Sequence, residues 1–244
     1  MAYFRRVMAW LLFFAGLIAL FFITSRIFIP KDNTEEAGME HVRANGILAE
    51  PPDSIDILVM GDSESYNSYS PLLMWKETGY TSFTCGTDAQ KLTYTKTLLE
   101  RALEKQKPKV VILETLAIYR PIKLDNVVLE ELSSTFPVFR YHDRWKSLSP
   151  ADFTQPVTAT QTHPYKGHAH ITKVVPCDNK EYMHPTDKAA SIALVNQYYV
   201  KAIKELCDRH GAQLLLVSTP SPVNWSYERH NGIQKFAEEL GCDY

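Results

Sequence analysis

The N-terminal apolar run constrains this chain more than any other feature. Residues 7–23 read VMAWLLFFAGLIALFFI, 17 residues without a charged side chain, and the uncharged window between Arg6 and Arg26 holds 19 residues. At 1.5 Å per residue, a helix over this window is about 29 Å long, close to the hydrocarbon thickness of a bilayer. The sequence therefore predicts a helix that can cross a membrane.

A cleaved signal peptide is the alternative interpretation of the same run. The apolar region of a signal peptide is usually about 7–15 residues long and precedes a small-x-small cleavage site. Here the run is longer and residues 24–28 (TSRIF) contain no such site, so we expect an uncleaved signal anchor. Arg5 and Arg6 precede the run, and no acidic residue occurs among the first thirty. The positive-inside rule then predicts a cytoplasmic N-terminus, with everything after Pro30 exported.

The charge of the exported part argues against one class of partner. Arg5, Arg6 and Arg26 account for three of the 26 basic residues, which leaves 23 beyond residue 30 against 28 acidic residues. A net charge of −5 provides no electrostatic footprint for nucleic acid. The four cysteines include no Cys-x-x-Cys pair; disulfides are possible outside the membrane, but packing can suffice in a domain of this size.

Short apolar runs alternate with helical patterns in the rest of the chain. This alternation implies a three-layer α/β/α fold, with a parallel sheet covered on both faces. We expect one domain over 54–244 after a polar linker at 31–53, with an irregular insertion at 121–185 that serves as a lid, a binding loop or a partner surface. The predicted strands are 55–60, 80–85, 110–113 and 214–217, and the predicted helices are 88–105 (capped by Asp88), 186–209 (ending at His210-Gly211) and 225–240 (ending at Gly241).

Polar residues follow three of the predicted strands at their carboxyl ends. Gly61-Asp62-Ser63 follows the first strand, Gly86 ends the second, and Glu114-Thr115 follows the third. In open parallel sheets ligands bind beyond these ends, so we expect Ser63, Gly86 and Glu114 to share one crevice. There Ser63 is either a nucleophile beside free helix N–H groups or only a helix cap. Glu114 is either a crevice carboxylate or a capping acid.

The same residues carry a family resemblance. Residues 57–63 (ILVMGDS) resemble block I of the SGNH (GDSL-type) esterase and acyltransferase superfamily, and Gly86 resembles its block II glycine. Segments 109–115 (KVVILET), 142–145 (HDRW) and 165–167 (YKG) look like recurrent segments of its membrane-anchored branch, which includes DltD-like and alginate-acetylation-like proteins. The likeness covers most of residues 54–244.

The resemblance implies a flavodoxin-like sheet with Ser63 as the nucleophile and no metal or organic cofactor. The tetrahedral oxyanion would be held by Gly86 and the Ser63 N–H. Ser65, at a helix start, should point elsewhere, and the absence of a Gly-x-Ser-x-Gly elbow argues against an α/β-hydrolase. The residues assigned to the oxyanion or the substrate are Gly86, Asp62, Thr115, Glu114 and His142.

Two departures from the superfamily pattern concern the rest of the machinery. Leu116 stands near the place of the block III asparagine and cannot donate a hydrogen bond, so Thr115 or a backbone N–H would replace that donor. The final Asp-x-x-His is absent, and residues 241–244 lie where the strand before it would begin. We therefore expect a chain truncated at its C-terminus.

No histidine sits where the superfamily places its base. A serine needs a base to attack at neutral pH. His142 is the best candidate for a base or a substrate contact, with a structural role in the insertion as the alternative. His210 and His230 occupy helix positions typical of surface residues, and His168 with His170 form a lone His-x-His typical of a solvated loop.

The combined features predict an extracytoplasmic, membrane-anchored serine esterase or O-acyltransferase acting on a cell-envelope polysaccharide or teichoic acid. A membrane-bound acyltransferase is a possible partner. The competing hypothesis is a non-catalytic envelope protein that keeps the fold to bind a polymer or a membrane partner. An Asp-x-x-His beyond Tyr244 would favour the enzyme, and without it we expect no activity on model acetyl esters.

Overall fold

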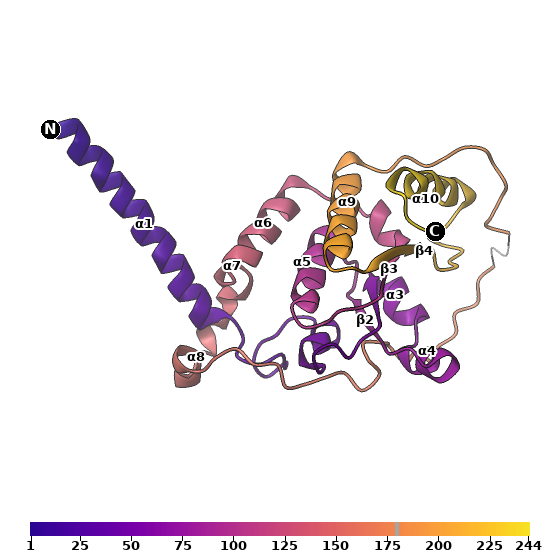
Figure 1. The fold of residues 1–244 in the computed structure, drawn as a ribbon, viewed down its shortest axis with the longest axis horizontal. Helices are drawn as coiled ribbons and strands as arrows, with labels where there is room; N and C mark the ends of the chain where they lie inside the picture. The colour runs from indigo at the N-terminus through magenta and orange to yellow at the C-terminus, as the bar shows by residue number, and fades with distance from the viewer. Residues whose placement is uncertain (179–180) are drawn as a thin grey trace. The chain divides into compact units, whose positions relative to one another are not determined.

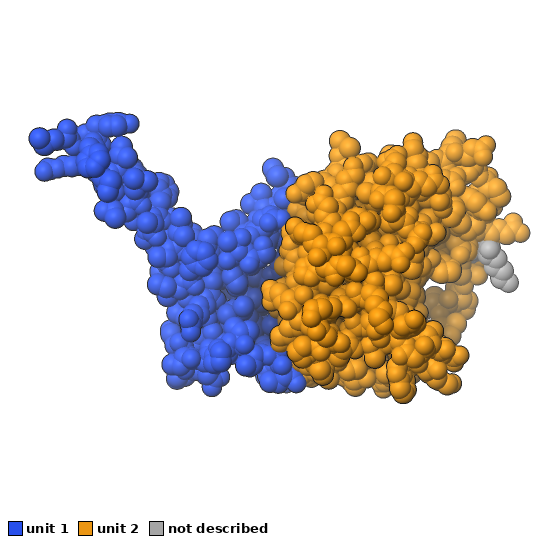
Figure 2. All heavy atoms as spheres, viewed as in Figure 1, with its two compact units in different colours: residues 1–39, 124–160 blue, residues 40–123, 161–244 orange. Residues whose placement is uncertain are grey.

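A computed structural model describes residues 1–178 and 181–244, and they form two compact units. Unit 1 contains residues 1–39 and 124–160, and unit 2 contains residues 40–123 and 161–244 (Figure 2). The predicted linker and the predicted insertion are therefore each divided between the units. In unit 2 the first segment folds into α2 (Val42–Asn45) and η1 (Gly46–Ala49), and Ala44 and Ile47 are buried. Residues 42–49 are thus part of the packed structure and not of a free stalk.

Unit 2 is built on a parallel sheet, which has four strands in the described residues (Figure 1). The strand order β2-β1-β3-β4 and the parallel pairing confirm the α/β architecture. The cores of β1, β2 and β3 are almost completely buried, which explains their near-continuous apolar runs, whereas β4 buries Leu214 and Leu216 and leaves Leu215 and Val217 partly exposed. The strands are β1 (Ile57–Gly61), β2 (Ser82–Gly86), β3 (Val110–Glu114) and β4 (Gln213–Val217).

Helices cover both faces of this sheet. Helices α5 and α9 pack side by side over one face, and α3 lies on the other (Figure 1). Fully buried side chains such as Leu98 and Ile203 fill the layer beneath α5 and α9, and burial of one such side chain contributes about 1.5–3 kcal/mol. The helices of unit 2 are α3 (Ser63–Ser68), α4 (Pro71–Thr78), α5 (Leu92–Leu103), η2 (Thr115–Tyr119), α9 (Leu194–Arg209) and α10 (Tyr227–Leu240).

Two helix starts differ from the sequence prediction. Asp88 does not cap the helix that follows β2, because α5 begins at Leu92 and Asp88 accepts a hydrogen bond from the Tyr66 hydroxyl instead. Residues 186–193 are not helical, because their backbone bonds to α10: the Ala190 N–H donates to Glu228 O over 2.7 Å, and Asn231 Nδ2 donates to Thr186 O over 2.7 Å. Tertiary contacts thus override the helical spacing in this segment.

Both edges of the sheet have further backbone partners. At the β2 edge, the Thr84 N–H donates to Lys166 O over 2.9 Å. Gly167 lies so close to Thr84 that a Cβ there would collide with the Thr84 carbonyl, and its φ of +84° suits glycine. At the β4 edge, Asp243 pairs in parallel with Leu215. The Tyr-Lys-Gly segment therefore covers a strand edge that would otherwise be open.

Unit 1 contains one helix that is long and apolar enough to span a membrane or to act as a signal anchor. This helix, α1 (Ala2–Phe28), exposes most of its apolar side chains, whereas the core helix of a soluble protein would bury them. Near its end, Phe21 and Phe22 contact Phe136, with ring centroids 5.4 and 5.1 Å apart. The other helices are α6 (Leu124–Thr135), α7 (Val138–Tyr141), η3 (His142–Lys146) and α8 (Pro150–Thr154).

The His-Asp-Arg-Trp segment of η3 stabilises the end of α1. Arg144 donates to Phe28 O over 2.5 Å and forms an ion pair of 2.7 Å with Asp152. Both side chains of this pair are largely buried. His142 itself is two-thirds exposed, and its Nδ1 lies 3.1 Å from Phe139 O. Within unit 1 the structural role of this segment therefore belongs to Arg144, and both interpretations of His142 stay predictions.

Candidate functional site

The sheet register brings the predicted site residues to one edge. Gly61 pairs with Gly86 across β1 and β2, and Met60 pairs with Leu113, so Glu114 follows at the level of Gly61. These positions are the last in their strands, and all strands run parallel. Ser63 begins the helix directly after β1. Ser63, Gly86 and Glu114 thus gather at the carboxyl edge of the sheet, as the sequence predicts.

Ser63 occupies the first position of α3, and Asp62 is the capping residue. The Asp62 carboxylate accepts a hydrogen bond of 2.9 Å from the Glu64 N–H, so the cap is Asp62 and not Ser63. The Ser63 side chain is partly exposed and has no hydrogen-bond partner in the described part of the chain. Its N–H belongs to the first turn, where a helix provides no acceptor. Ser63 is therefore accessible to a ligand.

Ser65 has a structural position. It is fully buried, and its Oγ donates to Asp62 O over 2.7 Å. The hydroxyl lies against Gly86, where an added Cβ would collide with it and would come within 3.0 Å of Asp62 O. Gly86 is therefore required for close packing of α3 on β2, a reason for the glycine that is independent of any oxyanion role.

A buried ion pair lies beneath the Ser63 turn. Arg120 binds the Asp62 carboxylate, whose side chain is completely buried, while the Arg120 side chain remains 29% exposed. Asn196 of α9 fixes the arginine backbone, because its Nδ2 donates to Ile118 O and Arg120 O over 2.9 and 2.8 Å. Loss of one partner from such a pair costs about 3–5 kcal/mol, because the other charge stays buried. Asp62 could be predicted as a site residue from the sequence, but Arg120 could not.

Glu114 is a buried acid next to Asp62. Burial, together with repulsion from Asp62, raises the pKa of Glu114 to about 8. The carboxyl accepts hydrogen bonds from the Leu116 N–H over 3.0 Å and from the Thr219 hydroxyl over 3.2 Å. Glu114 is thus both a capping acid for η2 and an edge carboxyl, and a pKa near 8 keeps it mostly protonated at pH 7.

Thr115 is turned toward β4. It is fully buried, and its Oγ1 lies 2.5 Å from Ser218 Oγ, just beyond the end of β4. Ser218 Oγ lies 2.8 Å from the Tyr244 hydroxyl. The Thr115 hydroxyl therefore already has a partner, and no described contact joins it to Ser63.

The described contacts do not assign a histidine base to Ser63. None of the described histidines forms a hydrogen bond with Ser63. His142 belongs to unit 1. His230 is not a simple surface residue as expected, because its Nδ1 lies 3.0 Å from the Tyr244 hydroxyl and its ring lines a pocket. His163 lies beside Gly46, and burial lowers its pKa.

Two features near the edge have no simple sequence signal. Asn224, in the segment after β4, donates from Nδ2 to Glu64 of α3 over 2.8 Å. Tyr69 has a buried hydroxyl without a partner in the described residues, and burial with the nearby Glu114 charge raises its pKa. Only the fold brings these side chains near the edge.

No protein-family model matches the chain, and no curated protein matches it.

Proposed function

We propose that unit 2 is an SGNH-type serine esterase or O-acyltransferase domain. One observation carries the proposal: Ser63 is partly exposed, has no hydrogen-bond partner among the described residues, and follows β1 at the carboxyl edge of the parallel sheet, where Gly61 pairs with Gly86. Ligands bind at this edge in open α/β sheets. The Asp62–Arg120 ion pair supports the proposal, because it fixes the turn that carries the partly exposed Ser63 hydroxyl.

The reaction would follow the usual course of serine acyl transfer. Ser63 Oγ would attack the carbonyl carbon of an ester and give its proton to a base. The Ser63 N–H and the Gly86 N–H would hold the tetrahedral oxyanion. Its collapse would release the alcohol and leave an acyl group on Ser63, which water or a polymer hydroxyl would then accept. A cell-envelope polysaccharide or teichoic acid would be the substrate.

The proposal includes a location. Helix α1 would be an uncleaved signal anchor with Arg5 and Arg6 in the cytoplasm, because positive residues flank the cytoplasmic end of a span. Unit 2 would then face the cell envelope, where the polymer and a membrane-bound acyltransferase are accessible.

A non-catalytic envelope protein is the second candidate. The observation in its favour is that no described histidine bonds to Ser63, so the described residues contain no assembled Ser-His pair. Such a protein would use the same edge to bind a polymer without cleaving it.

Hydrolysis of 4-nitrophenyl acetate by the protein extracted from its membrane separates the two. In a protein that carries the Asp-x-x-His beyond Tyr244, the esterase proposal expects turnover that Ser63→Ala removes and that Ser65→Ala retains in the folded fraction. Removal of a triad nucleophile costs about 10⁴–10⁶ in turnover. Equal rates for wild type and Ser63→Ala would contradict the esterase, and retained polymer binding would then favour the binder.

A further inference from the structure

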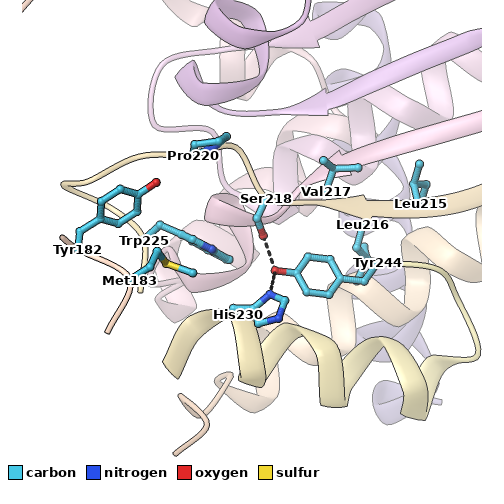
Figure 3. Close-up of a pocket in the computed structure, with 10 residues that line it drawn as sticks. All are labelled: Tyr182, Met183, Leu215, Leu216, Val217, Ser218, Pro220, Trp225, His230 and Tyr244. Carbon is cyan, nitrogen blue, oxygen red and sulfur yellow. Dashed lines mark hydrogen bonds between the residues drawn. The ribbon is translucent and has the colours of Figure 1, made fainter. Parts of the chain in front are cut away.

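A hollow of unit 2 lies at the end of β4, and Ser63 is not among the residues that line it. It is a pocket of about 420 Å³ between the β4 edge and α10 (Figure 3). This volume is within the range of small-molecule sites, which favour the carboxyl ends of α/β sheets. Its walls are mostly apolar or aromatic, and Figure 3 labels all ten lining residues, among them Tyr182, Met183, Pro220 and Trp225.

A series of hydrogen bonds forms the polar side of the pocket. Thr115 Oγ1 lies 2.5 Å from Ser218 Oγ, Ser218 Oγ lies 2.8 Å from the Tyr244 hydroxyl, and that hydroxyl lies 3.0 Å from His230 Nδ1. Figure 3 shows the Ser218 and His230 contacts converging on the Tyr244 hydroxyl. Burial raises the pKa of Tyr244, so its hydroxyl remains protonated at neutral pH. Each hydroxyl oxygen has two acceptor lone pairs, so this side of the pocket retains acceptor capacity.

The backbone holds this polar side in place. The Leu216 N–H donates to Asp243 O over 2.9 Å, and the Cys242 N–H donates to Ala237 O over 3.1 Å. The ring of Tyr244 packs against that of His230 with centroids 5.3 Å apart. The backbone on both sides of the Tyr244–His230 contact is therefore fixed before any ligand binds. This lowers the entropy cost of binding.

Trp225 provides a hydrogen-bond donor on another wall of the pocket. Trp225 is largely buried and packs edge-on against Tyr119, with centroids 6.2 Å apart. Its indole N–H has no acceptor in the described part of the chain. Figure 3 shows the Trp225 indole and the Tyr244 hydroxyl lining the same pocket. A ligand oxygen could accept from Trp225 while a ligand hydroxyl donates to Tyr244 or Ser218.

The lining also decides the charge of the ligand. None of the ten lining residues is a lysine, arginine, aspartate or glutamate, and the one lining histidine, His230, already has its Nδ1 3.0 Å from the Tyr244 hydroxyl. A carboxylate or phosphate would therefore lose its hydration without gaining a lysine or arginine partner, which is costly. Aromatic walls and the Met183 thioether suit an aromatic ring.

We propose that this pocket is a binding site for an uncharged aromatic compound that carries a hydroxyl group. The site is separate from the acyl chemistry proposed for Ser63 and does not depend on it. The ring would lie between Met183 and Trp225, and the hydroxyl would face Ser218 and Tyr244.

Binding of 2-naphthol to the 244-residue chain in detergent tests the proposal. We expect saturable binding by calorimetry, and 2-naphthoate should bind at least about tenfold more weakly because its carboxylate is not compensated. Met183→Trp should fill the pocket and remove the saturable signal. Val175→Trp places the same side chain at a highly exposed position outside the pocket lining and should bind like wild type. Detergent takes up the same amount of probe in every sample, so differences between variants report the site.

Two further variants keep the test independent of folding and of Ser63. Ser218→Ala removes one hydroxyl and should weaken 2-naphthol about threefold to tenfold. Ser63→Ala should leave the affinity unchanged whether or not the protein is an esterase. Equal binding by wild type and Met183→Trp, or equal affinities for 2-naphthol and 2-naphthoate, would overturn the proposal.

Discussion

The buried acid at the sheet edge makes the stability of unit 2 depend on pH. Glu114 has a pKa of about 8 in the folded protein against an ordinary value of 4.5. Above pH 4.5 the unfolded chain loses the Glu114 proton while the folded chain keeps it. The unfolded state is then favoured increasingly until about pH 8. The loss amounts to about 3–4 kcal/mol between pH 5 and pH 8.

Glu114→Gln removes this ionisation and keeps most of the shape. The amide oxygen can still accept from the Leu116 N–H, while the contact with Thr219 is weakened, which costs about 1 kcal/mol. At pH 5 the variant should therefore be about as stable as wild type. At pH 8 the variant should be more stable than wild type by about 3 kcal/mol. Only the wild type has an acid at this position that ionises freely in the unfolded chain but not in the folded one.

Urea unfolding followed by tryptophan fluorescence at pH 5, 6, 7 and 8 measures the difference. Glu104→Gln is the matched control, since Glu104 is exposed at the end of α5, and its difference from wild type should not change with pH. A constant difference between Glu114→Gln and wild type across the range would refute the argument that burial and Asp62 hold the proton on Glu114.

Three other outcomes follow from the packing and the charges. Gly86→Ala should destabilise unit 2 by about 1–3 kcal/mol in urea unfolding, because the new methyl group overlaps Ser65 Oγ, and Ser65→Gly in the same chain should recover part of the loss. Arg144→Met should lower the free energy of unfolding by about 3–5 kcal/mol in thermal unfolding, because Asp152 is left charged and buried. The double variant with Asp152→Asn should lose less stability, and equal losses would exclude the ion pair as the cause. On intact spheroplasts, added protease should degrade residues 31–244, and protection of that segment would contradict the proposed orientation.

The strands could be predicted from the sequence because burial on both faces leaves a local signal. Each predicted strand lies within two residues of the observed one at both ends, and parallel pairing follows from the alternation with helices. The meeting of Ser63, Gly86 and Glu114 could be predicted for the same reason, since parallel strands end at one edge. Segment 186–193 could not, because its backbone partners in α10 lie about 40 residues further along the chain.

The polar contacts of the site were less predictable. Asp62 and Arg120 are 58 residues apart, and they meet only because η2 ends close to the first turn of α3. His230 has the spacing of a surface residue in α10, yet the pairing of Asp243 with Leu215 places the Tyr244 hydroxyl beside its ring. Such contacts depend on tertiary geometry and leave no periodic pattern in the sequence.

The central claim is that Ser63 is a nucleophile, and covalent labelling tests it most directly. A fluorophosphonate should react with the membrane-extracted protein, with Ser63 Oγ bonding to phosphorus and fluoride leaving. Peptide mass spectrometry should then find the adduct on Ser63 in the wild type and in Ser65→Ala, and no adduct in Ser63→Ala. A wild-type protein that stays unlabelled, or that carries the adduct on a serine other than Ser63, would contradict the claim.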